Sequence, residues 1–282
     1  MINPDDLYAL IDQALKEDIG DGDHTSLACI QSLKEGKAQL IIKEKGVLAG
    51  VEVAQHVFYR FDPFLKITVF INDGDMVSPG DVVFTVEGRI ISILQCERVV
   101  LNIMQHLSGI ATKTRMYVEK LAGTTTKLLD TRKTTPGMRL LDKEAVRIGG
   151  GGNHRFGLYD MILIKDNHID FAGGIEKAIN AVNQYLEKRG KMLKIEIEAR
   201  SLDDVKCIIQ HNRIHRIMFD NFDVETTRKA VKIVNGHYET ESSGNITLDN
   251  IRDYALCGVD FISVGALTHH VKGLDMSLKA IE

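Results

Sequence analysis

The spacing of apolar residues divides the sequence into two regions with different rhythms. The first region is predicted to contain a helix, a strand or hairpin, a short helix, antiparallel strands and a long helix. In order, these are residues 4–18, 38–50, 51–61, 65–88 and 91–107. The first helix is expected because its apolar positions recur at helical spacing, and the antiparallel strands because Asp-Gly and Pro-Gly turns interrupt an alternating pattern.

The second region repeats a short apolar run six times. The runs lie near residues 127, 161, 193, 216, 238 and 260. Helical patterns separate the later runs, and the segment 247–258 starts with Thr247 as an expected N-cap and ends in a glycine. Such alternation is typical of a parallel α/β sheet. We predict a complete or incomplete α/β barrel, with a doubly wound sheet as the alternative.

The predicted strands of this second region end in polar residues. These are Arg132 with Lys133, Lys165, Glu198, Asp220, Ser243 with Gly244, and Gly265. The carboxyl ends of the strands form the active face of α/β barrels. A cap on the following helix explains any one of these residues equally well. Because polar residues follow all six predicted strands, an active face is the better interpretation.

Basic residues at the first of these strand ends, and in a glycine-rich loop that follows it in the sequence, indicate an anionic ligand. The planar fork of Arg132 can bind a carboxylate or a phosphate at two points, and Lys133 adds a compact charge. His154 and Arg155 follow four consecutive glycines, a loop in which backbone amides can approach an anion. A merely flexible loop explains the glycines equally well. The pattern is neither a P-loop nor a dinucleotide fingerprint.

Two carboxylates and two further loops are additional candidates for ligand binding. Glu198 and Asp220, at neighbouring strand ends, could hold Mg²⁺, bind sugar hydroxyls, stabilise a cationic sugar, or simply pair with nearby bases. The segments 242–247 and 263–268 offer backbone amides suited to phosphate, although ordinary turns explain each alone. Together these features predict a ligand that contains a phosphate, with a carboxylate-bearing partner.

Composition narrows the classes of function. The chain has 282 residues, 44% of them hydrophobic and 26% charged, and a net charge of −4. This balance argues against nucleic-acid binding by bulk electrostatics. The four cysteines lie too far apart for a zinc or redox motif and are expected to be reduced. Without a signal peptide or a run of ~18 apolar residues, the protein is predicted to be cytoplasmic, with no membrane partner.

Nine motifs along nearly the whole chain resemble the quinolinate phosphoribosyltransferase family. They are EDIGDGDHTS, CERVVLN, DTRKTTPGMR, GGGGNHR, ILIKDNH, IEIEARSLDD, MFDNF, ESSGNIT and ISVGALTHHVKGLDMSLK. The resemblance implies a Mg²⁺-dependent transfer of phosphoribosyl from phosphoribosyl pyrophosphate to quinolinate. Pyrophosphate and CO₂ leave, and nicotinate mononucleotide for NAD synthesis remains. It also implies an N-terminal open α/β sandwich over 1–108, an α/β barrel over 109–268, and a tail, 269–282, that packs back on the first domain.

The resemblance assigns roles to individual residues. Those expected at the two carboxylates of quinolinate are Arg98, Arg132, His154 and Arg155. Lys133 and Lys165 would lie between the two substrates, and Glu198 and Asp220 would face the ribose and its Mg²⁺; these four are the expected catalytic residues. The 5′-phosphate would be held by Ser243, Gly244, Asn245, Val264 and Gly265. The family also implies a homodimer or hexamer in which Arg98 is contributed across the interface.

Two alternatives remain at this point. One is a relative of the family that accompanies molybdate-transport operons, in which the carboxylate site is relaxed. The intact set of Arg132, His154 and Arg155 disfavours it. The other is a non-catalytic phosphosugar-binding or regulatory protein, which would not need Glu198 and Asp220 beside the bases.

Overall fold

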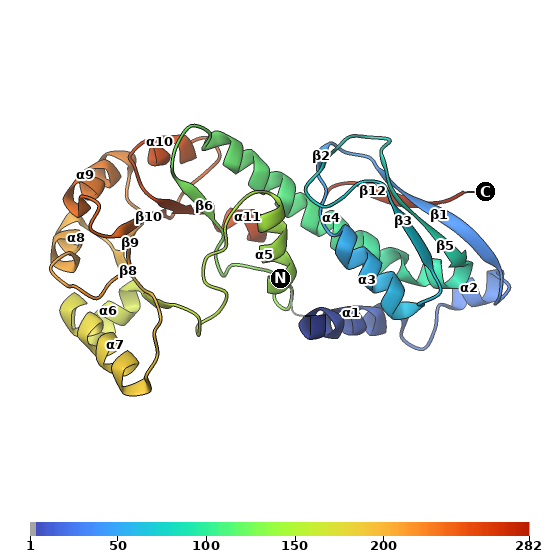
Figure 1. Cartoon of the computed structure of the whole chain (residues 1–282), viewed down its shortest axis with the longest axis horizontal. Coiled ribbons are helices and arrows are strands. Elements are labelled where there is room, and N and C mark those ends of the chain that lie inside the picture. The colour runs from blue at the N-terminus through green and yellow to red at the C-terminus, as the bar shows by residue number, and fades with distance from the viewer. Residues whose placement is uncertain (1–3, 282) are drawn as a thin grey trace. The chain divides into compact units, whose positions relative to one another are not determined.

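The structure is a computed structural model that describes residues 4–281, and the chain folds into two compact units (Figure 1). Among the described residues, the first unit is built from 4–115, 134–150 and 266–281, and the second from 116–133 and 151–265. The architecture is mixed α/β, as predicted, with an antiparallel sheet in the first unit and a parallel sheet in the second.

The first unit contains a four-stranded antiparallel sheet in the order β12-β1-β5-β3. Its strands are β1 (Glu35–Ile42), β3 (Lys66–Val69), β5 (Val82–Arg89) and β12 (Met276–Ile281). The predicted segment 38–50 is not a hairpin: β1 pairs with β5 and β12, whereas β2 (Gly46–Val47) pairs with β4 (Met76–Val77). The carboxyl-terminal strand β12 therefore completes a sheet begun near the other end of the chain.

Helices complete the first unit, and one of them packs on this sheet. They include α1 (Pro4–Ile19), α2 (His24–Cys29), α3 (Val51–Phe61), α5 (Arg139–Ile148) and α11 (Ala266–His269). Phe58 of α3 meets Phe84 of β5 edge to face, with 6.0 Å between the ring centroids, a favoured geometry for aromatic pairs. Both side chains are fully buried, so the short helix predicted over 51–61 forms and packs its apolar face on the sheet.

The predicted helix 91–107 is longer than expected, because α4 spans Ile90–Lys120. No proline interrupts it, and its one glycine, Gly109, has a packing reason. A Cβ atom there would lie 2.3 Å from the carbonyl oxygen of Lys272. Only a glycine therefore lets the carboxyl-terminal segment approach this helix so closely.

The second unit is an incomplete α/β barrel of six parallel strands in the order β6-β11-β10-β9-β8-β7. The strands are β6 (Lys127–Leu129), β7 (Ile162–Ile164), β8 (Ile195–Ala199), β9 (Arg216–Asp220), β10 (Glu239–Ser243) and β11 (Phe261–Ser263). Consecutive strands are neighbours from β7 to β11, and β6 adjoins β11. Among the described strands only the closing pair, β6 with β7, is missing. This winding confirms the barrel and excludes the doubly wound alternative, whose strand order reverses direction.

Helices lie around the outside of the curved sheet (Figure 1). They are α6 (Asp166–Ala172), α7 (Ile175–Arg189), α8 (Leu202–Ile208), α9 (Val224–Val234) and α10 (Ile251–Ala255). The helix predicted from Thr247 begins only at Ile251, because a turn intervenes in which Asn250 Oδ1 accepts the N–H of Thr247 at 2.8 Å. Asn250 is therefore the N-cap.

Two expectations about the whole chain are tested by simple observations. All four cysteines are free, with Cys96 and Cys257 buried and Cys29 and Cys207 exposed. Within residues 4–281, no helix combines the length and the apolar character that a membrane crossing needs.

The strands of the barrel alternate between apolar and charged side chains. On β8, Ile195, Ile197 and Ala199 are buried, while Glu196 and Glu198 lie between them on the opposite face. Bulky branched residues usually fill the interior of such barrels. Here the inner face carries charge instead, and that face forms the candidate site.

Candidate active site

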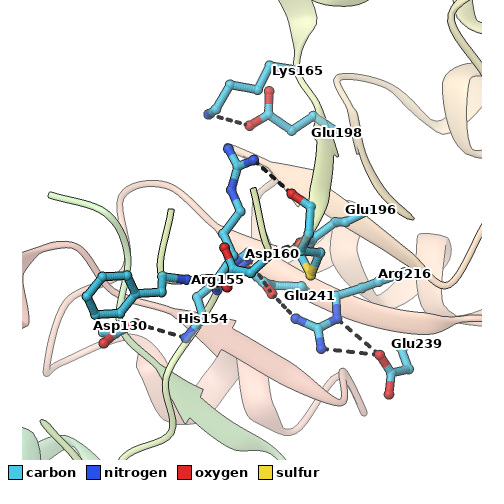
Figure 2. Close-up of polar contacts among 12 residues, drawn as sticks. Asp130, His154, Arg155, Asp160, Lys165, Glu196, Glu198, Arg216, Glu239 and Glu241 are labelled. Carbon is cyan, nitrogen blue, oxygen red and sulfur yellow. Dashed lines mark hydrogen bonds and ion pairs between the residues drawn. The ribbon is translucent and has the colours of Figure 1, made fainter. Parts of the chain in front are cut away.

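Lys165 and Glu198 form an ion pair at the carboxyl ends of β7 and β8 (Figure 2). Lys165 Nζ donates to Glu198 Oε1 at 2.9 Å, and the backbone N–H of Asp166 donates to Glu198 Oε2 at 3.1 Å. The N–H of Lys165 itself donates to His168 Nδ1 at 2.9 Å. Glu198 is therefore fixed by the first turn of α6, while the Lys165 side chain remains 47% exposed.

Asp220, at the end of β9, lies near this pair. Burial and the negative charge of Glu198 raise the pKa of the Asp220 carboxyl above its ordinary value. Asn221 Nδ2 donates to Asp220 Oδ2 at 3.0 Å. Two carboxylates thus lie near each other, with the positive charge of Lys165 acting on both, and a cation placed there would relieve their remaining repulsion.

Arg132 and Arg155 bring two guanidinium groups close together. Burial, and then the positive charge of Arg132, lower the pKa of Arg155. Arg155 Nη1 donates to the carbonyl oxygen of Met161 at 3.2 Å. Arg132 Nε is buried and has no hydrogen-bond partner among the described residues. Because buried donors are nearly always paired, this donor suits a ligand with an acceptor atom, such as an anion.

His154 is held by the protein at three atoms. Its backbone N–H donates to Asp130 Oδ1 at 2.8 Å, and its Nδ1 accepts the N–H of Arg155 at 2.7 Å. Its Nε2 lies 2.9 Å from Glu196 Oε2, a charge contact rather than a linear hydrogen bond. The side chain is only 6% exposed. The ring is therefore fixed at Nδ1, while its Nε2 faces the carboxylate of Glu196, and a place for His154 at the substrate stays a prediction.

Beneath these groups lies a second layer of charge that the sequence analysis missed. Glu196 and Glu241 are fully buried, and burial raises the pKa of each to about 7. Arg216 Nη1 donates to Glu241 Oε2 at 2.8 Å, and the guanidinium carbon lies 3.8 Å from the centroid of the Phe261 ring. Arg216 also pairs with Glu239 at 3.2 Å (Figure 2).

The motifs IEIEA and ETESS contained a signal for this layer. Acids two positions apart on a strand point to the same face, so Glu196 must share the face of Glu198, and Glu239 that of Glu241. A buried strand that repeats acids in this way places charge inside the sheet.

Ligand atoms of His154, Glu196 and Glu241 lie within 4.8 Å of one another, as in a metal site. Arg216 already bonds Glu241 there, and its positive charge would repel a dication. Glu198 and Asp220 offer the oxygen ligands that Mg²⁺ prefers, and their positive neighbour, Lys165, is half-exposed and can move away.

The loop after β10 adopts left-handed backbone at consecutive positions. Gly244 has φ +90° and Asn245 φ +54°. A Cβ atom on Gly244 would lie 2.2 Å from Asn221 Oδ1, which also accepts from Asn245 Nδ2 at 3.0 Å. Asparagine tolerates this conformation better than other residues with a side chain, so Asn245 suits this turn. The N–H of Asn221 donates to the Ser243 carbonyl at 2.8 Å, so this loop is joined to the end of β9.

The remaining predicted residues occupy different settings. The N–H of Val264 donates to the carbonyl of Leu129 at 3.0 Å, which uses that amide within the sheet. Gly265 follows directly, at the end of β11. Lys133 is exposed in the loop after β6, and its N–H donates to Thr131 Oγ1 at 3.1 Å. Arg98 is an exposed residue of α4 and belongs to the first unit.

Comparisons with known proteins agree over almost the whole chain. Models of the N-terminal and C-terminal domains of quinolinate phosphoribosyl transferase match residues 23–108 and 110–279. A Nicotiana tabacum protein named quinolinate phosphoribosyltransferase [decarboxylating] 1b is 46% identical over 289 residues, which cover 97% of this chain and 82% of that protein. A Bacillus subtilis protein named probable nicotinate-nucleotide pyrophosphorylase [carboxylating] is 42% identical over 96% of this chain and 92% of its own length.

Solved structures give the same result. The crystal structure of NadC from Streptococcus pyogenes superimposes with a TM-score of 0.93, at 39% identity, over 100% of this chain and 99% of that one. Some plant relatives carry the words chloroplastic or mitochondrial in their names, so a cytoplasmic location stays a prediction. Two matching domain models and relatives above 40% identity establish that the chain belongs to the quinolinate phosphoribosyltransferase family.

Proposed function

We propose that this site transfers phosphoribosyl from phosphoribosyl pyrophosphate to quinolinate and releases pyrophosphate and CO₂, leaving nicotinate mononucleotide. The observation that carries the proposal is the pair of Arg132 and Arg155, two close guanidinium groups with a buried, unpartnered Nε on Arg132. Such a pair suits a ligand with two adjacent carboxylates, because each arginine can bind one of them in a bidentate manner.

The carboxylate layer beside these arginines suits the ribosyl donor. Lys133 and Lys165 would lie between the two substrates, and Glu198 and Asp220 would hold Mg²⁺ together with the ribose. The raised pKa of Asp220 supports this assignment, since it reflects burial and, after that, the negative charge of Glu198 beside it. Bound Mg²⁺ would supply charge neutralisation for the departing pyrophosphate.

The chemical steps require little more than positioning and charge. As pyrophosphate leaves, positive charge develops on the ribose C1, and the carboxylates of Glu198 and Asp220 stabilise it. The ring nitrogen of quinolinate attacks C1 from the opposite face and becomes cationic. The adjacent 2-carboxylate then leaves as CO₂, its bonding electrons stay on the ring carbon beside that nitrogen, and a proton from the solvent completes the C–H bond there. The arginines hold the ring in place for this attack.

The glycine-containing loops suit the 5′-phosphate. Ser243, Gly244, Asn245 and Gly265 would hold it with backbone amides and a hydroxyl. The left-handed backbone at Gly244 and Asn245 supports the proposal, because successive residues of unusual φ make concave groups of N–H donors. Val264 would support this loop from within the sheet, since its N–H bonds Leu129.

We propose further that the protein works as a homodimer or hexamer, with Arg98 of the partner subunit completing the quinolinate site. The exposure of Arg98 on α4 leaves its guanidinium available for such a role. Co-expression of an Arg98→Ala copy with a Lys165→Ala copy tests it. Each variant alone would be inactive, and mixed dimers would recover part of the activity in the one site that has both residues. Failure to recover any activity in verified mixed dimers would contradict the shared site.

The proposed reaction is tested by mixing the protein with Mg²⁺, quinolinate and phosphoribosyl pyrophosphate and measuring nicotinate mononucleotide. Arg132→Ala should raise the KM for quinolinate by about 10- to 150-fold, since one charged hydrogen-bonded pair contributes about 1.5–3 kcal/mol. Arg213→Ala is the matched control, because Arg213 pairs with Glu187 on the exposed outer surface. An unchanged KM would remove Arg132 from the site. Tight binding of either substrate without product would favour the phosphosugar-binding alternative.

A further inference from the structure

The loop that follows β10 is joined at its base to the end of the neighbouring strand, β9. Ser243 and Asp220, the last residues of the two strands, are partners in the parallel pairing. The Ser243 carbonyl then accepts the N–H of Asn221 at 2.8 Å, so the contact continues one residue beyond the paired ends. Asn221 therefore lies between two parts of the proposed donor site, the acid Asp220 and the phosphate loop, residues 243–245.

The side-chain amide of Asn221 contacts both of these parts. Its Nδ2 donates to Asp220 Oδ2 at 3.0 Å, and its Oδ1 accepts from Asn245 Nδ2 at 3.0 Å. Gly244 lies directly against the same oxygen, since a Cβ atom there would be 2.2 Å from Asn221 Oδ1. One amide thus connects the carboxylate at the end of β9 with the loop after β10.

The backbone conformation at this junction is unusual. Among residues 4–281, three residues other than glycine have a positive φ, and all are asparagines: Asn221 at +58°, Asn235 at +47° and Asn245 at +54°. Asn235 ends α9, where a left-handed residue is common. Neither Asn221 nor Asn245 ends a helix, yet their side chains bond each other. Sparsely populated backbone conformations tend to cluster at functional sites, and here two of them meet at one hydrogen bond.

The far side of the phosphate loop is fixed separately. Asn250 Nδ2 donates to the carbonyl of Asn245 at 3.1 Å, and Asn250 Oδ1 accepts the N–H of Thr247 at 2.8 Å. The side chain of Ile246, between them, is buried. Asn250 therefore fixes the loop relative to α10, whereas Asn221 fixes it relative to Asp220.

We propose that Asn221 is a positioning residue that sets the placement of the phosphate loop relative to Asp220, and thereby fits the site to a ribose that carries a 5′-phosphate. This inference rests on the proposed function, in which Asp220 faces the ribose and the loop holds the 5′-phosphate. Such a donor is held at its ring and at its phosphate, and both holds must be correctly spaced before C1 is in position to react.

Asn221→Gly removes the amide but tolerates the left-handed backbone and keeps the N–H that Ser243 accepts. At saturating quinolinate, it should lower kcat/KM for phosphoribosyl pyrophosphate about 10- to 100-fold, since a misplacement of about 1 Å can cost 100-fold. The KM for quinolinate should stay within about 2-fold, because the residues proposed to bind its carboxylates lie on other segments. Asn235→Gly, the same change in the same conformation on an exposed residue away from the site, is the matched control.

Two results with these variants would contradict the proposal. One is an unchanged kcat/KM for phosphoribosyl pyrophosphate in Asn221→Gly. The other is an equal rise in the KM values of both substrates, which would indicate general damage to the site rather than misplacement of one loop.

A double-mutant cycle with Gly244→Ala tests whether the loop rests on this amide. In the unmodified background the added Cβ meets Asn221 Oδ1, whereas in the Asn221→Gly background that atom is gone and the nearest remaining atom of the residue is its backbone nitrogen, at 3.1 Å. Gly244→Ala should therefore lower kcat/KM for phosphoribosyl pyrophosphate by less than about 3-fold in the second background, because residues in contact are not additive. Equal losses in the two backgrounds would contradict the contact.

A crystal structure of the unmodified protein with ribose 5-phosphate gives an answer that does not depend on variants. We expect the phosphate on the backbone amides of the loop, with Asn221 Nδ2 still on Asp220 and its Oδ1 still on Asn245. A bound phosphate with the Asn221 amide turned away from both partners would overturn the inference. Absence of nicotinate mononucleotide formation by the unmodified protein would instead overturn the proposed function, so the two failures are distinguishable.

Discussion

The barrel contains two layers of carboxylates, and their settings differ. In the outer layer, Glu198 pairs with the half-exposed Lys165 and lies near Asp220. In the inner layer, Glu196 and Glu241 are fully buried and meet Arg216, whose side chain is 11% exposed. The acids of β8 that belong to the two layers are only two residues apart. The position of an acid along the strand, and its resulting burial, therefore decides whether its carboxylate is available to a ligand; residue type does not.

The physical reason is desolvation. A flexible lysine in contact with water can leave its carboxylate when a substrate or a cation arrives, so the outer pair can exchange partners. A buried guanidinium cannot leave without exposing an uncompensated charge, so the inner group keeps one arrangement. We expect the outer layer to take part in turnover. The inner layer should stabilise the fold and hold the substrate-binding residues in position. The predictions below test this division, starting with the largest effect.

Removal of Arg216 should have the largest effect on stability. Arg216→Met leaves Glu241 buried without its partner, and breaking a buried pair in this way costs about 3–5 kcal/mol of unfolding free energy. Urea denaturation measures the loss. Arg213→Met removes an exposed partner of Glu187 and should change stability by no more than about 1 kcal/mol. Equal losses of unfolding free energy in the two variants would contradict the distinction between buried and exposed ion pairs.

Glu198→Gln should have the largest effect on turnover. Gln still accepts the N–H of Asp166 but lacks the negative charge that stabilises the transition state. We expect kcat to fall about 100- to 1000-fold, as for loss of one electrostatic contact at a reacting centre. Unfolding free energy should change by less than about 1 kcal/mol, because the partner lysine is half-exposed. A variant with normal kcat would exclude Glu198 from the reaction.

Gly244→Ala should have an intermediate effect, at the rim of the outer layer. The added Cβ would meet Asn221 Oδ1 at 2.2 Å in a left-handed conformation. Backbone strain of about 1–3 kcal/mol is expected, together with a raised KM for phosphoribosyl pyrophosphate. Gly123→Ala is the control, since Gly123 has φ +80° but nothing within 4 Å of the added atom. Its KM should be normal, and a normal KM in Gly244→Ala would exclude this loop from the donor site.

The smallest expected effect is a pH dependence of stability that comes from the inner layer. Burial raises the pKa of Glu241 from 4.5 to about 7, so the folded protein retains a proton that the unfolded chain releases. This contribution to stability is fully present below pH about 4.5 and is lost as pH rises through about 7. The stability difference between the unmodified protein and Glu241→Gln should therefore change between pH 5 and 7.5. A difference that stays constant over this range would contradict the raised pKa.

The sequence predicted the outer layer better than the inner one. Lys165 and Glu198 were placed at neighbouring strand ends by the barrel pattern alone, and the structure has their charged atoms 2.9 Å apart. The family inferred from the motifs is confirmed by both domain models and by the named relatives. These features could be predicted because strand ends and ordered motifs are local properties of a sequence.

The inner layer could not be predicted in the same way. Alternating acids in β8 and β10 fit a solvent-facing strand as well as a polar interior, and only the closure of the barrel decides between them. His154 was expected at the substrate because the resemblance to the family implies that role. Its contacts with Asp130 and Glu196 depend on a segment that lies where β6 and β7 do not pair. No local sequence pattern predicts the position of that segment.

The most direct test of the division between layers compares two variants on the same strand, Glu196→Gln and Glu198→Gln, by measuring kcat and the KM for quinolinate in the synthesis of nicotinate mononucleotide. We predict that Glu198→Gln loses kcat about 100- to 1000-fold. Glu196→Gln should keep kcat within about 3-fold and raise only the KM for quinolinate, the signature of weakened substrate binding. Equal losses of kcat in both variants, or the reverse order, would contradict the account.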